Sequence, residues 1–169
     1  MIEFISIPEE RADILKTNAK FVRKLEELAN VKITFVEGTD IQIESDDSIQ
    51  MMHAKDVIKA FGRGFEFENA LCLLDDEYGL CVIDVKEFSG RSTDRLNELK
   101  GRIIGREGKT KNIIEKATET KLSIYGKTIS IMGKWSSVQF AKDAICLLLE
   151  GRRHGTVYRF LEENIKRVK

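Results

Sequence analysis

One pattern of residues occurs twice along this 169-residue chain, which favours a fold built from two copies of one unit. The segment Ala54-Lys-Asp-Val-Ile58 recurs as Ala141-Lys-Asp-Ala-Ile145. Around both segments, apolar residues follow a 3, 4, 3 spacing, which predicts one buried face of a helix. The predicted faces consist of Met51, Ala54, Ile58 and Phe61 in the first copy and Val138, Ala141, Ile145 and Leu148 in the second.

Upstream of each helix, apolar and polar residues alternate as in half-buried strands. Each copy is predicted to run strand, helix, helix, strand, strand, helix, with hairpin turns at Gly38 and Gly126. The predicted strands are 2–7, 31–36 and 40–44 in the first copy and 80–86, 121–125 and 128–132 in the second. Additional helices are expected at 66–74 and, with Val157, Leu161, Ile165 and Val168 on one side, after Gly155.

The segment "GRIIGREGKT", residues 101–110, permits two interpretations. A nucleotide-binding P-loop needs a glycine where Ile103 stands and a strand before it, whereas Asp94 to Lys100 predicts a helix. The remaining pattern is Gly105-Arg-Glu-Gly108 between two helices, which is the G-x-x-G loop of nucleic-acid clamps or an ordinary tight turn. The first copy has Lys16-Thr-Asn-Ala19 instead, so the same turn forms without glycine there, which favours a functional loop in the second copy.

The net charge of zero hides a strong asymmetry between the two halves of the chain. Residues 1–88 hold 10 Lys/Arg and 19 Asp/Glu, and residues 89–169 hold 18 and 9. A basic half with a glycine loop can bind a phosphate backbone and release its counterions. The same phosphates would repel an acidic half. The alternative is that the two halves only attract each other, which leaves the glycine loop without a purpose.

Several function classes lack their sequence signals. The longest apolar run, Ala144 to Leu149, is too short to span a bilayer, and we expect a soluble cytoplasmic protein with no membrane partner. Cys72, Cys81 and Cys146 are scattered in apolar segments, which predicts reduced thiols rather than disulfides. Only two histidines occur, and no zinc-binding spacing is found. We therefore expect no metal and no cofactor.

The order of elements and the "IIGREG" core resemble the type I KH domain, here present twice. The segments "GRIIGREGKTKNIIEKATETK", "GRGF" (62–65), "NALCLLDDEYGLCVIDV" (69–85) and "AKDAICLLLEGRRHGTVYRFLEE" together resemble the archaeal branch of the Pno/Dim (partner of Nob) family. The resemblance covers essentially the whole chain. Many KH domains have an apolar residue three positions after the second loop glycine, where this chain has Lys111. The Pno/Dim family itself uses lysine there.

The resemblance implies an α+β fold with two tandem type I KH domains, each a three-stranded antiparallel sheet packed by three helices. A degenerate first domain would occupy 1–79, and a competent second domain with an extra C-terminal helix would occupy 80–169. It further implies an RNA-binding protein of ribosome biogenesis that binds single-stranded RNA near the 3′ end of small-subunit ribosomal RNA and assists its processing. Implied partners are the Nob endonuclease and the alpha subunit of translation initiation factor two, and we expect a monomer.

The candidate RNA-binding residues surround the glycine loop. Gly105 and Gly108 would let a phosphate approach, while Arg102, Arg106, Lys109 and Lys111 would attract it. Ile104 and Ile113 would form an apolar floor, although a role in the core is equally consistent with the pattern. The remaining candidates are Glu107 within the loop, Asn112, Arg152 and Arg153. The last two, together with Arg159, Lys166 and Arg167, would either extend the RNA-binding surface or form a solvated face.

Two other classes remain open. A metal-dependent nuclease would need a carboxylate cluster, for which Asp75, Asp76 and Glu77 are the candidates, but the acidic residues lie mostly in the half without the glycine loop. A protein adaptor, linking the initiation factor to the ribosome, would use the acidic half and leave the glycine loop idle. We therefore expect a binding protein rather than an enzyme.

Overall fold

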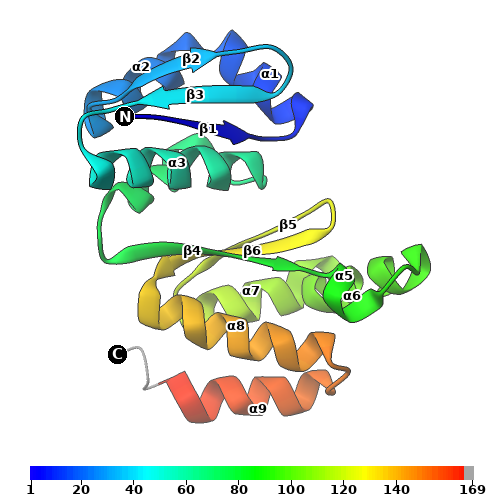
Figure 1. Ribbon diagram of the computed structural model, residues 1–169. Coiled ribbons are helices and arrows are strands. Elements are labelled where there is room, and N and C mark those ends of the chain that lie inside the picture. The colour runs from blue at the N-terminus through cyan, green and yellow to red at the C-terminus, as the bar shows by residue number, and fades with distance from the viewer. Residues whose placement is uncertain (166–169) are drawn as a thin grey trace. The chain divides into compact units, whose positions relative to one another are not determined.

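The structure is a computed structural model that describes residues 1–165, and it divides into two compact units, Met1–Tyr78 and Gly79–Lys169 (Figure 1). Each unit holds one three-stranded antiparallel sheet with helices, so the fold is mixed α+β. Lys166, Arg167 and Val168, named above as candidate RNA-binding or helix residues, lie outside the described residues. Within residues 1–165, no helix is long and apolar enough to cross a membrane.

The first unit contains β1 (Ile2–Ser6), α1 (Glu9–Thr17), α2 (Ala19–Ala29), β2 (Lys32–Phe35), β3 (Asp40–Glu44), α3 (Ser48–Gly62), α4 (Phe67–Ala70) and a 3-10 turn at Leu71–Leu74. Its sheet has the order β1-β3-β2. The side chain of Asp47 begins α3 by accepting from the backbone N–H of Ile49 at 2.8 Å. The predicted helical face is confirmed, because Met51, Ala54, Ile58 and Phe61 are all buried.

The second unit contains β4 (Tyr78–Asp84), α5 (Lys86–Ser89), α6 (Thr93–Ile104), a 3-10 turn (Arg106–Gly108), α7 (Lys109–Thr118), β5 (Lys121–Tyr125), β6 (Thr128–Lys134), α8 (Trp135–Leu149) and α9 (His154–Asn164). The sheet order β4-β6-β5 repeats that of the first unit. Val138, Ala141, Ile145 and Leu148 are buried as predicted, and Val157 and Leu161 of α9 are buried in the same core.

Both hairpin turns form at the predicted glycines, since Gly38 and Gly126 have φ values of +74° and +54°. Several predicted boundaries are wrong: the strands expected at 2–7, 31–36 and 128–132 are Ile2–Ser6, Lys32–Phe35 and Thr128–Lys134. The strand expected at 80–86 is Tyr78–Asp84, and it ends earlier than expected because Asp84 Oδ1 accepts from the backbone N–H of Lys86 and turns the chain into α5. The helix expected at 66–74 is two pieces, α4 and the 3-10 turn at Leu71–Leu74.

Within residues 1–165, Cys72, Cys81 and Cys146 form no disulfide. Burial raises the pKa of the Cys146 thiol above its usual value. A raised pKa keeps the thiol protonated at neutral pH, so Cys146 is a poor nucleophile and a poor metal ligand.

Candidate nucleic-acid interface

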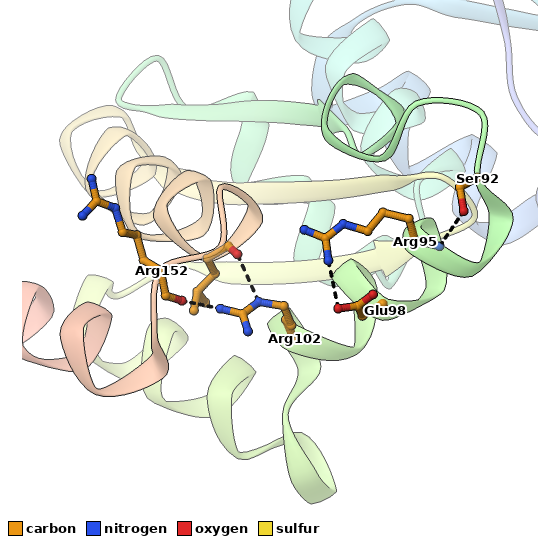
Figure 2. Close-up of polar contacts among 6 residues, drawn as sticks. Ser92, Arg95, Glu98, Arg102 and Arg152 are labelled. Carbon is orange, nitrogen blue, oxygen red and sulfur yellow. Dashed lines mark hydrogen bonds and ion pairs between the residues drawn. The ribbon is translucent and has the colours of Figure 1, made fainter.

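The glycine loop of the second unit is held between two helices with buried inner faces. Helix α6 begins where Ser92 Oγ accepts from the backbone N–H of Arg95, and Arg95 pairs with Glu98 on its surface (Figure 2). Leu99 and Ile103 of the same helix are buried. Because a helix, and not a strand, leads into the loop, the P-loop interpretation is excluded.

Gly105 ends α6 in a conformation that only glycine adopts without strain. Its φ and ψ are +73° and 176°, and its N–H donates to the carbonyl of Gly101 at 2.9 Å. A Cβ atom added here would fall 2.3 Å from Thr110 Oγ1 and 2.7 Å from the Thr110 nitrogen. The first loop glycine therefore serves close packing between the end of α6 and the start of α7, in addition to its predicted role in phosphate approach.

The rest of the loop is open on its outer side. Glu107 has φ +55° and Gly108 has φ +79°, so two successive residues are left-handed. A Cβ atom at Gly108 would meet no atom of the described residues within 4 Å. Gly108, the N-cap residue of α7, has no side chain that could cap the first turn, which leaves backbone N–H groups of that turn for an anion.

This difference between the two glycines gives a prediction. Gly105→Ala should lower the free energy of unfolding by about 2 kcal/mol more than Gly108→Ala, because both add strain at positive φ but only the first adds a clash. Urea denaturation of the two variants and the wild type measures this difference. Equal destabilisation by the two substitutions would contradict the packing role of Gly105.

An open groove adjoins the loop. It has a volume of about 490 Å³, within the range of clefts that hold ligands. Three cationic side chains and one carboxylate contribute to its lining, together with an amide and an apolar residue. The lining residues are Arg106, Glu107, Lys109, Asn112, Ile113 and Lys116. Cationic groups around a partly apolar surface suit a phosphate backbone and the bases attached to it.

Five of the twelve candidate residues line this groove, namely Arg106, Glu107, Lys109, Asn112 and Ile113, and Gly105 and Gly108 form the turn beside it. Ile104, Lys111, Arg152 and Arg153 are not among the lining residues. Ile104 is 37% exposed, so it is not a core residue. Lys116 was not predicted to belong to the site, although Lys109, Asn112, Ile113 and Lys116 follow the i, i+3, i+4, i+7 spacing of one helical face.

Arg102 has a structural role that the sequence did not reveal. Its Nε donates to the carbonyl of Leu148 at 3.1 Å, and its Nη2 donates to the carbonyl of Arg152 (Figure 2). These carbonyls lie at and just beyond the end of α8, where backbone acceptors lack partners within the helix. Arg102 thus joins α6 to the segment after α8, and its contribution to RNA binding remains a prediction.

The corresponding turn of the first unit is closed. A single residue, Asn18, connects α1 to α2 with φ −115°. Its Nδ2 donates to the carbonyl of Ile14 at 2.7 Å, and its backbone N–H bonds to the same carbonyl. This turn has neither left-handed residues nor glycine, so the backbone cannot present an open face there.

The acidic residues considered as metal ligands take part in local contacts. Asp75 Oδ1 accepts from the backbone N–H of Glu77 at 2.9 Å, and Asp76 pairs with His53 Nε2 at 2.7 Å. Within residues 1–165, no three His, Cys, Asp or Glu side chains are grouped to hold a metal ion.

A G-x-x-G loop between two helices beside a three-stranded antiparallel sheet defines a KH domain. Residues 79–166 match the family model of the second KH domain of Pno1, described as a eukaryotic-type (type I) KH domain. The chain therefore belongs to the Pno1/Dim2 family of KH-domain proteins.

Relatives and solved structures agree with this membership. The chain is 38% identical to a KH domain-containing protein of Methanocaldococcus jannaschii, over 99% of this chain and 76% of that protein. It is 30% identical to a pre-rRNA-processing protein Pno1 of Kluyveromyces lactis, over 98% of this chain and 63% of that protein. Its fold is similar to a chain in the crystal structure of the a/eIF2alpha–aDim2p–rRNA complex of Pyrococcus horikoshii, with a TM-score of 0.87, 35% identity, and coverage of 98% of this chain and 94% of that one.

Proposed function

We propose that the chain binds single-stranded ribosomal RNA near the 3′ end of the small-subunit rRNA, and that it assists maturation of the small subunit and processing of that end. The observation that carries this proposal is the open, left-handed G-x-x-G turn beside a groove lined by Arg106, Lys109 and Lys116. The relative named as a pre-rRNA-processing protein and the solved complex with rRNA support it.

In this proposal the two units are tandem KH domains with different tasks. The second unit clamps about four nucleotides, with the loop at the backbone and the groove of α7 beside the bases. The first unit has the closed turn at Asn18 and a surplus of acidic residues, so it does not hold RNA. Its task is to orient the second unit or to bind a basic protein surface.

The proposed protein partners are consistent with this division of tasks between the two units. The solved complex contains the alpha subunit of initiation factor two, which supports a second function as an adaptor between that factor and the rRNA. We also propose that the chain acts as a monomer and presents the rRNA cleavage site to the Nob endonuclease. Catalysis is assigned to that partner, because the one carboxylate lining the groove, Glu107, stands among three cationic side chains rather than in a carboxylate pair.

Crosslinking to total cellular RNA, followed by sequencing of the attached fragments, tests where the chain binds. We expect the fragments to concentrate near the 3′ end of the small-subunit rRNA. Fragments spread evenly over cellular RNA would contradict the proposed target, and loss of the RNA during incubation would indicate a nuclease instead. The control is the same experiment with a chain that carries both Lys109→Glu and Lys116→Glu. RNA fragments that still crosslink to this variant come from contacts outside the groove.

A further inference from the structure

We infer that Tyr158 of α9 is a positioning residue for RNA binding, which acts through Thr110 to hold the G-x-x-G turn in its open form. This inference rests on the proposed RNA-binding function. Helix α9 follows α8, and its buried Val157 and Leu161 explain only why it packs on the core. Polar residues of α9, in contrast, form hydrogen bonds with residues at the two ends of the glycine loop.

The first of these contacts fixes the start of α7. Thr110 is 2% exposed, and its Oγ1 lies 2.9 Å from Tyr158 Oη in a hydrogen bond. The same Oγ1 atom occupies the space that a Cβ atom at Gly105 would fill, at 2.3 Å. One buried oxygen therefore touches the first loop glycine on one side and α9 on the other. Thr110 also follows Gly108 by two residues, so its position sets the direction of the N–H groups at the start of α7.

A second set of contacts fixes the end of α6. His154, the first residue of α9, bonds through Nε2 to the carbonyl of Arg102 at 3.0 Å. Arg102 in turn donates to the carbonyls of Leu148 and Arg152. The segment from the end of α8 into α9 thus holds both helices that flank the loop. No polar contact of this kind is needed for burial of the apolar face of α9.

This arrangement has a consequence for binding. The loop contains two left-handed residues in succession, Glu107 and Gly108, and such a turn persists only where its surroundings fix it. A backbone clamp loses affinity when its N–H groups are not already directed at the phosphate, since ordering them then opposes binding. Loss of the Tyr158 hydroxyl should therefore weaken RNA binding although Tyr158 does not line the groove.

The test uses the full chain and an oligonucleotide that copies the 3′ end of small-subunit rRNA. Tyr158→Phe and Thr110→Val should each raise Kd about fivefold, the equivalent of one hydrogen bond. The double variant should bind no worse than either single variant, because both remove the same bond. Thr110→Ser, which keeps the hydroxyl, should bind more tightly than Thr110→Val. Tyr78→Phe is the matched control, because it removes a hydroxyl from the start of β4 instead.

Three outcomes would overturn the inference while leaving the proposed function in place, and the first two are a Tyr158→Phe affinity equal to wild type and additive losses in the double variant. Thermal unfolding of each variant separates the effects, because a loss of affinity in a chain that is still fully folded at the assay temperature cannot come from unfolding. An equal loss from Tyr78→Phe would also overturn it. If the wild type does not bind the oligonucleotide, the proposed function fails and this inference fails with it.

Discussion

Gly108→Asp should lower RNA affinity more than 100-fold while the chain remains folded. The site of a Cβ atom at Gly108 is open, so the new side chain projects into the space where a phosphate would approach. Its carboxylate then repels the phosphate and occupies the free N–H groups at the start of α7. Aspartate tolerates the left-handed conformation at φ +79° better than most residues, so the cost to stability is about 1 kcal/mol.

The matched control for this variant is Gly38→Asp in the first unit. Gly38 also has a positive φ, +74°, and a Cβ atom there would also meet no atom of the described residues within 4 Å. The two variants therefore add the same charge with similar strain, one at the loop and one at the β2–β3 hairpin. Fluorescence anisotropy of labelled RNA measures both. If the two folded variants bind RNA with equal affinity, the loop is not part of the RNA-binding site.

Much of the fold was predictable because both copies follow short-range periodicities. The 3, 4, 3 faces of α3 and α8 and the strands Asp40–Glu44 and Lys121–Tyr125 were predicted with the boundaries or residues that the structure has. One error occurs where a local hydrogen bond ends an element, at Asp84, whose side chain accepts from the Lys86 N–H. Such a bond competes with the strand but leaves no trace in the apolar pattern.

The candidate site was predictable in part for the same reason. Gly105 and Gly108 were evident from their spacing, and Lys116 could have been found from the helical face that begins at Lys109. The bonds from Arg102 to Leu148 and from Thr110 to Tyr158 join residues more than 45 positions apart. Contacts of this kind depend on how the helices pack, so a single sequence does not reveal them.

The two units should differ in RNA binding by at least about 100-fold when they are prepared separately. Residues 79–169 should retain most of the affinity of the full chain, and residues 1–78 should not bind. Apart from Tyr78, the first residue of β4, which stays with the first fragment, each fragment keeps its own sheet and buried residues, so each is expected to fold. The first unit has the closed turn at Asn18 and more acidic than basic residues, while the second has the open loop and the cationic groove.

The measurement that tests this division most directly is an anisotropy titration of both fragments and the full chain against the rRNA 3′-end oligonucleotide over a series of salt concentrations. Circular dichroism first establishes that each fragment is folded. Neutralisation of four to six phosphates predicts a log–log salt slope of about −3 to −4 for the full chain and for residues 79–169. Binding of residues 1–78 as tight as that of residues 79–169, or binding by the second unit that does not change with salt, would contradict the assignment of RNA binding to the glycine loop and its groove.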